Sequence, residues 1–151
     1  MKDLIQILDE ITKYGLEANL ALVNKEEDLE RFLVALYAQY FTIQFKFDDQ
    51  DYADFDRSMF PNVVENVKKN FPDFGWYHSI LNCYEILQDA EIGAGDAIDD
   101  LSDIIYDVLE IKWRLEHNSL ADGLWFFEFI FNSHTQQHII DLLNYLKAKN
   151  G

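Results

Sequence analysis

The chain of 151 residues carries 12 Lys and Arg against 28 Asp and Glu, so its formal net charge is −16. Apolar residues make up 49% and aromatic residues 15%, which excludes an acidic disordered protein because such chains lack the apolar area for a core. The charge repels phosphate backbones and argues against nucleic-acid binding, and no apolar stretch approaches the ~20 residues of a membrane span.

Apolar residues at steps of three and four predict amphipathic helices in the N-terminal third. The first helix is expected from about residue 4 to 22, and the second from about 29 to 47. The acidic segment 48–56 is predicted to be a solvated surface loop. A calcium loop is the weaker alternative there, because the central Gly and the final Glu of a helix–loop–helix site are absent at the required offsets.

The middle third holds both prolines of the chain. Pro61 suits the first position of a short third helix, which must end before Pro72. Helical spacing of apolar residues then resumes, and it predicts a fourth helix over 76–87, before Gly93 and Gly95 break the chain.

Two longer helices complete the chain. Asp96 is a good N-cap for a fifth helix that ends near Leu115, and Ser119 is the N-cap of a last helix that reaches about Lys147. The sequence therefore predicts an all-α fold, a single-domain bundle of about six helices over residues 1–151.

The last helix is apolar nearly all round between 124 and 131. A helix without a polar face is typical of the centre of a bundle. We therefore expect a central, aromatic-rich C-terminal helix in which Trp125, Phe127 and Phe131 are mostly buried.

Two histidines four residues apart, His134 and His138, share one face of this last helix. Asp100, Asp103 and Asp107 form a stripe on the fifth helix. The connection between the two helices is short, which makes them antiparallel neighbours and brings the acidic stripe level with the histidines. These five residues are the candidate polar cluster.

The cluster has two interpretations. In the first, Asp–His hydrogen bonds and an acidic solvated face stabilise the bundle. In the second, Asp103, Asp107, His134 and His138 ligate a divalent metal such as zinc or iron. The Glu-x-x-His pairs of di-iron bundles are absent, because Phe131 stands three residues before His134. The first interpretation is favoured, because the H-x-x-x-H spacing is common by chance.

Other chemistry-bearing residues give weaker indications. The only cysteine, Cys83, lies beside an apolar stripe without basic neighbours, so we expect an inert buried thiol. His78 and His117 are expected at the surface, and Glu128 on a narrow exposed edge. No G-x-S-x-G, P-loop, G-x-G-x-x-G or paired-cysteine zinc motif occurs.

The C-terminal half resembles an uncharacterised bacterial family, domain of unknown function 5063. The acidic stretch 99–104 followed by Asp107 is similar to one of its motifs, and the aromatic run after Trp125 with Ser-His-x-x-x-His at 133–138 is similar to another. The likeness covers residues 93–146, with a looser match at 74–77. The family often has Trp-Gly after the first His, where this chain has Thr-Gln. The resemblance implies a compact helical bundle in a bacterial cytoplasm and no particular activity.

Two functional hypotheses follow. The first is a non-catalytic, cytoplasmic interaction module that binds a protein partner through an acidic or aromatic surface and needs no cofactor. The second is a metal-binding bundle with a divalent metal as cofactor and with hydrolysis or redox chemistry as its candidate activities. A single cysteine and an N-terminus without a signal-peptide pattern both favour the cytoplasm. The sequence leaves open whether the protein is an enzyme.

Overall fold

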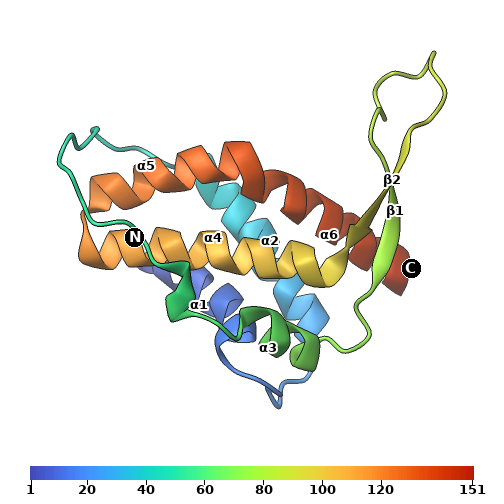
Figure 1. Cartoon of the computed structure of the whole chain (residues 1–151), viewed down its shortest axis with the longest axis horizontal. Helices are drawn as coiled ribbons and strands as arrows, with labels where there is room; N and C mark the ends of the chain where they lie inside the picture. The colour runs from blue at the N-terminus through green and yellow to red at the C-terminus, as the bar shows by residue number, and fades with distance from the viewer.

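The computed structural model describes all residues from Met1 to Gly151, and its helices lie side by side as a bundle (Figure 1). The helices are α1 (Lys2–Leu16), α2 (Lys25–Tyr40), α3 (Val63–Asn70), α4 (Ala97–His117), α5 (Leu120–Ile130) and α6 (Gln136–Asn150). A π-helical turn, η2 (Phe131–Thr135), joins α5 to α6 without a break, and we call the three together the C-terminal rod. A single 3-10 turn, η1 (Arg57–Met59), precedes α3.

The bundle therefore has five helical rods instead of about six, because the predicted fourth helix over 76–87 is absent. That segment forms strand β1 (Trp76–Ile80) and a loop, and β1 pairs antiparallel with β2 (Ile92–Asp96). The fold is mostly helical with a two-stranded sheet rather than all-α. We call residues 76–96 the hairpin.

The glycines explain why this segment is a hairpin. A Cβ at Gly95 would lie 2.3 Å from the Tyr77 ring of the opposite strand, so only glycine lets the two strands pair with that ring packed across them. Apolar spacing alone does not separate a helix from a pair of short strands joined by an apolar loop, which is how the prediction failed.

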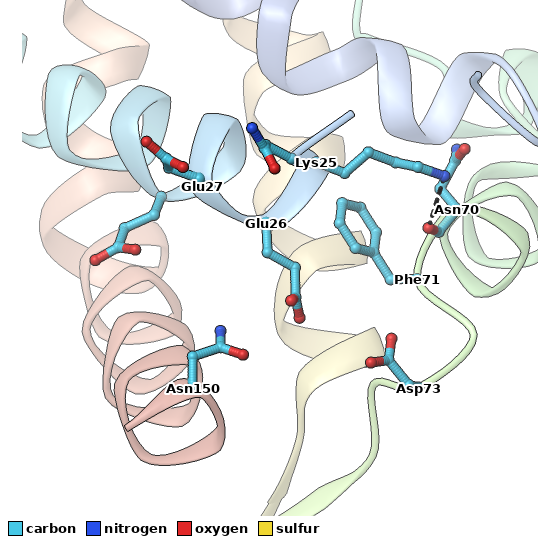
Figure 2. A pocket seen from close by; sticks show the side chains of 9 residues that line it. Lys25, Glu26, Glu27, Asn70, Phe71, Asp73 and Asn150 are labelled. Atoms are coloured by element: carbon cyan, nitrogen blue, oxygen red, sulfur yellow. Dashed lines mark hydrogen bonds between the residues drawn. The ribbon is translucent and has the colours of Figure 1, made fainter. Parts of the chain in front are cut away.

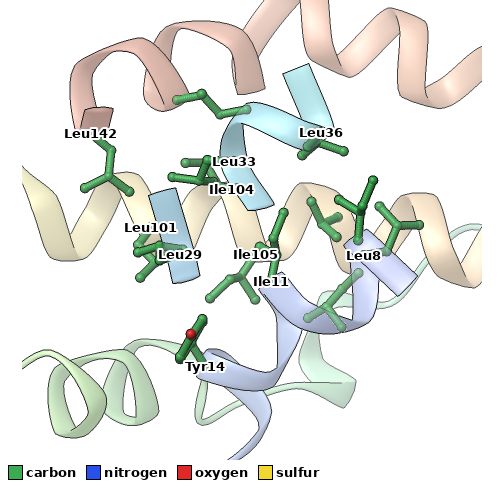
Figure 3. Close-up of a cluster of buried hydrophobic side chains, with 14 of the residues drawn as sticks. Leu8, Ile11, Tyr14, Leu29, Leu33, Leu36, Leu101, Ile104, Ile105 and Leu142 are labelled. Atoms are coloured by element: carbon green, nitrogen blue, oxygen red, sulfur yellow. The ribbon is translucent and has the colours of Figure 1, made fainter. Parts of the chain in front are cut away.

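Helix α4 lies at the centre of the bundle, in contact with α1, α3, α5 and α6. Its N-cap is Asp96, whose side chain accepts a hydrogen bond from the Ile98 amide at 2.9 Å. Figure 3 shows the core that forms around α4. The labelled side chains are Leu8, Ile11, Tyr14, Leu29, Leu33, Leu36, Leu101, Ile104, Ile105 and Leu142.

The aromatic-rich helix is less enclosed than its sequence indicates. Phe127 and Phe131 are fully buried, as predicted, whereas Trp125 is half-buried and stacks on the exposed Phe129 with ring centroids 5.6 Å apart. Glu128 is exposed, as predicted. The central position belongs to α4, because α5 packs against α4 and leaves its own far side to solvent.

The two N-terminal helices end earlier than predicted. Helix α1 ends at Leu16 instead of near residue 22, because the buried Asn70 amide donates to the backbone carbonyls of Tyr14 and Glu17 and fixes the loop that follows. After Tyr40 the chain runs without regular structure to η1, so the predicted surface loop over 48–56 is confirmed. None of the helices is both long enough and apolar enough to cross a membrane.

Candidate functional site

The predicted polar cluster comes together where α4 meets the C-terminal rod. The rod returns antiparallel to α4 after a two-residue connection, which Ser119 ends by capping the Asp122 amide at 3.0 Å. His134 then lies opposite Asp107, and His138 opposite Asp100. The antiparallel packing expected from the short connection is therefore present.

The first Asp–His pair joins His134 to the buried carboxylate of Asp107. His134 Nδ1 lies 2.7 Å from Oδ2 of Asp107, and the hydroxyl of the buried Thr135 donates to the same oxygen at 2.7 Å. Burial raises the pKa of the Asp107 carboxyl, and the hydrogen bonds from His134 and Thr135 oppose that rise. Asp107 thus fixes two side chains of the rod at once.

The second pair connects the cluster to the hairpin. His138 Nδ1 lies 2.7 Å from Oδ1 of Asp100, and the Tyr77 hydroxyl on β1 donates to the other oxygen of that carboxylate. The hydrogen bond to Asp100 raises the pKa of His138, against the lowering effect of burial. Burial and the contact with Asp100 raise the pKa of Tyr77 far above its usual range, so its hydroxyl keeps its proton.

The other nitrogens of the two rings converge. His134 Nε2 and His138 Nε2 lie 3.1 Å apart, and Oδ2 of Asp103 lies 3.5 Å from His138 Nε2. One ligand atom from each of these three residues falls within 4.8 Å of the others. A carboxylate accepts hydrogen bonds, so each Nδ1 carries the hydrogen and each neutral ring directs an Nε2 lone pair inward. Two facing lone pairs repel unless a proton or a metal ion lies between them.

The spacing is compatible with a metal ion. Zinc–nitrogen bonds of about 2.0–2.1 Å at a tetrahedral angle place two bound nitrogens about 3.3 Å apart. The two Nε2 atoms are at 3.1 Å. The carboxylate of Asp103, half-exposed and 3.7 Å from the Arg57 guanidinium, is the third donor.

All five predicted residues belong to this cluster, but they divide into two kinds. His134, His138 and Asp103 present donor atoms to a common point. Asp100 and Asp107 instead hold the outer nitrogens of the histidines. Asp107, predicted as a candidate metal ligand, instead holds His134 Nδ1 and the Thr135 hydroxyl, and it is not among the three residues whose donor atoms converge.

Sequence reasoning missed Thr135 and Tyr77. The signal for Thr135 is its place in the buried series 127, 131, 135 and 139, which keeps a step of four through η2. The Gln136 amide there bonds to the Phe131 carbonyl five residues earlier, the mark of a π turn. Tyr77 had no usable signal, because its position depends on a hairpin that apolar spacing did not predict.

Three further residues were expected away from any site. His78 and His117 are exposed, as predicted. Cys83 is exposed rather than buried, because it lies in the hairpin loop and not on a helix that faces the core.

A separate pocket of about 500 Å³ lies between the start of α2, the end of α3 and the end of α6 (Figure 2). Its lining is almost wholly polar and includes three glutamates from α2. Lys149 bridges two of its acidic groups, Glu26 at 2.7 Å and Asp73 at 2.9 Å. The pocket shares no residue with the Asp/His cluster.

No family model, curated protein or solved structure matches this chain. The resemblance to domain of unknown function 5063 therefore stays a prediction.

Proposed function

We propose that the protein binds one divalent metal ion between α4 and the C-terminal rod, through His134 Nε2, His138 Nε2 and the carboxylate of Asp103. The observation that carries this proposal is the 3.1 Å approach of the two Nε2 atoms while both Nδ1 atoms are held by carboxylates. Hydrogen bonding of the outer nitrogen to a carboxylate orients a metal-binding imidazole and increases its basicity.

The donor set also limits the chemistry of the ion. Two imidazoles and one carboxylate suit zinc and ferrous iron, and three protein ligands leave at least one position for water or substrate. Zinc would supply a water of lowered pKa for hydrolysis, and iron would supply redox chemistry. The bound metal therefore decides between the two activities that we propose for this site.

The first experiment is metal analysis of protein purified without added metal, followed by calorimetric titration of the chelator-treated protein with zinc chloride. We expect one zinc per chain. His134→Ala and His138→Ala should remove binding, and Asp100→Asn should weaken it about 10–100-fold, since loss of a supporting carboxylate has effects of that size.

The matched controls are His78→Ala and His117→Ala, which remove exposed histidines outside the cluster. They should bind zinc as the parent does. Unchanged zinc affinity in His134→Ala and His138→Ala would contradict the proposal.

We also propose that the protein binds a protein partner in the cytosol. This second function is supported by the exposed apolar side chains of the hairpin and does not depend on the metal.

A further inference from the structure

The hairpin extends beyond the bundle (Figure 1). Its tip carries large apolar side chains that are exposed. Leu87 is 99% exposed, Ile86 87% and Tyr84 83%. Single exposed apolar residues are common, but a contiguous group marks an interaction site.

One face of the ribbon extends this apolar group toward the bundle. Ile80 pairs with Ile92 and His78 with Ala94, and all four side chains are exposed. The opposite face carries Tyr77, whose ring covers Gly95 and whose hydroxyl reaches Asp100. The hairpin thus has one face fixed to the bundle and one exposed, mainly apolar face without a partner.

The loop that carries the tip has a defined backbone. The Leu81 amide bonds to the Glu91 carbonyl at 2.8 Å, and the Asn82 side chain bridges the loop to the Asp89 carbonyl and the Glu91 amide. Two tight turns follow inside it, at 82–85 and 85–88. Preorganisation of this kind lowers the entropy cost of binding.

The negative charge of the hairpin indicates the chemistry of the surface that it would bind. The hairpin contains four acidic residues, Glu85, Asp89, Glu91 and Asp96, and no Lys or Arg, within a chain of net charge −16. A second copy would bring like charges together, and anionic lipid surfaces would repel the tip. A surface that combines apolar side chains with Lys and Arg is complementary to both properties of the hairpin.

We propose that the hairpin is a docking arm that places Tyr84, Ile86 and Leu87 on an apolar protein surface flanked by Lys and Arg. This inference gives the chemistry of the partner in the protein-binding function proposed above, and it does not depend on the metal.

The test uses the full chain and a fluorescent 18-residue amphipathic helical peptide with Leu on one face and Lys on the other. Binding is measured by fluorescence anisotropy at 150 mM salt. Ile86→Ser with Leu87→Ser should weaken binding at least tenfold. The matched control is Leu22→Ser with Val23→Ser, an exposed apolar pair in the loop after α1, which should leave affinity unchanged.

A charge variant tests the flanking cations. Asp89→Asn with Glu91→Gln should weaken binding several-fold and reduce its dependence on salt. The same peptide with Glu in place of Lys should not bind. Both hairpin variants should melt as the parent does, because their side chains are exposed.

Three results overturn the inference and are distinguishable. Equal binding of the Lys and Glu peptides would reject the basic partner while retaining the arm as an interface. Unchanged affinity in the Ile86/Leu87 variant would reject the arm itself. Binding of zwitterionic phosphatidylcholine vesicles, or sedimentation as a dimer that this variant abolishes, would assign the tip to a lipid or to a second copy.

Discussion

Helix α4 and the hairpin both carry apolar residues at helical spacing. They differ in whether those side chains are buried. On α4 these residues are buried, and the inward-facing Asp100 and Asp107 find partners on the rod. In the hairpin Ile86 and Leu87 are almost fully exposed. The spacing of apolar residues shows which of them could share one face of a helix. Those residues become buried only when another helix or strand packs against that face.

The largest loss of stability is expected from Phe131→Ala, which tests the buried interface between α4 and the C-terminal rod. Phe131 is fully buried, and its ring stacks on Tyr40 with centroids 4.5 Å apart. Removal of the ring should lower the free energy of unfolding by about 3–5 kcal/mol, measured by urea denaturation. A loss below about 1 kcal/mol would show that the rod does not depend on this side chain for packing.

Asp107→Ala should produce the next largest loss in metal-free protein. It removes the acceptor of His134 Nδ1 and the nearer acceptor of the buried Thr135 hydroxyl, which keeps only the Ile130 carbonyl at 3.3 Å, at a cost of about 1–3 kcal/mol. Asp103→Ala, at a half-exposed carboxylate, should change stability by less than about 0.5 kcal/mol. Zinc titration should also distinguish the two variants, because the proposed metal site takes a ligand atom from Asp103 and none from Asp107. If both variants had equal effects on unfolding and on zinc binding, Asp103 and Asp107 could not be assigned different roles at the site.

The melting temperature should change less with pH than with these substitutions. The direction of that change distinguishes a proton from a metal ion between the two histidines. The pKa of His138 is raised, so its contribution in metal-free protein is complete below about pH 6.5 and fades as pH rises through the folded-state value. Bound zinc reverses the sign, because protons displace the metal in acid. Thermal melting between pH 5 and 8, with zinc and with chelator, measures both. The same slope under both conditions would contradict the metal site.

Leu87→Ser should have the smallest effect and would sharpen the contrast with Phe131. The side chain is 99% exposed, so unfolding free energy should change by less than about 0.5 kcal/mol. A loss above 1 kcal/mol in urea denaturation would mean that the tip packs on the bundle in solution.

The helical part of the fold and most of the site could be predicted from local sequence. Asp96 and Ser119 both cap helices as expected, and the short connection correctly set Asp107 and the histidines at compatible heights. Local capping and connection length are physical constraints that one sequence contains.

The remainder depends on contacts between distant residues. The approach of Tyr77 to Gly95 makes 76–96 a hairpin, and the bond from Asn70 to the carbonyl of Tyr14 ends α1. Neither contact can be read from apolar spacing. The π turn was missed because one extra residue in a long helix barely disturbs a pattern with steps of three and four.

The π turn has a consequence for the length of the C-terminal rod. An α-helix advances about 100° per residue, so the buried positions 127, 131, 135 and 139, three steps of four, would drift by about 120° around it. The rod is one residue longer than an ordinary helix with the same buried face. Deletion of the exposed Ser133 would give steps of four, three and four, which an α-helix satisfies. The π turn therefore accommodates the extra residue and returns residues 135 and 139 to the buried side of the rod.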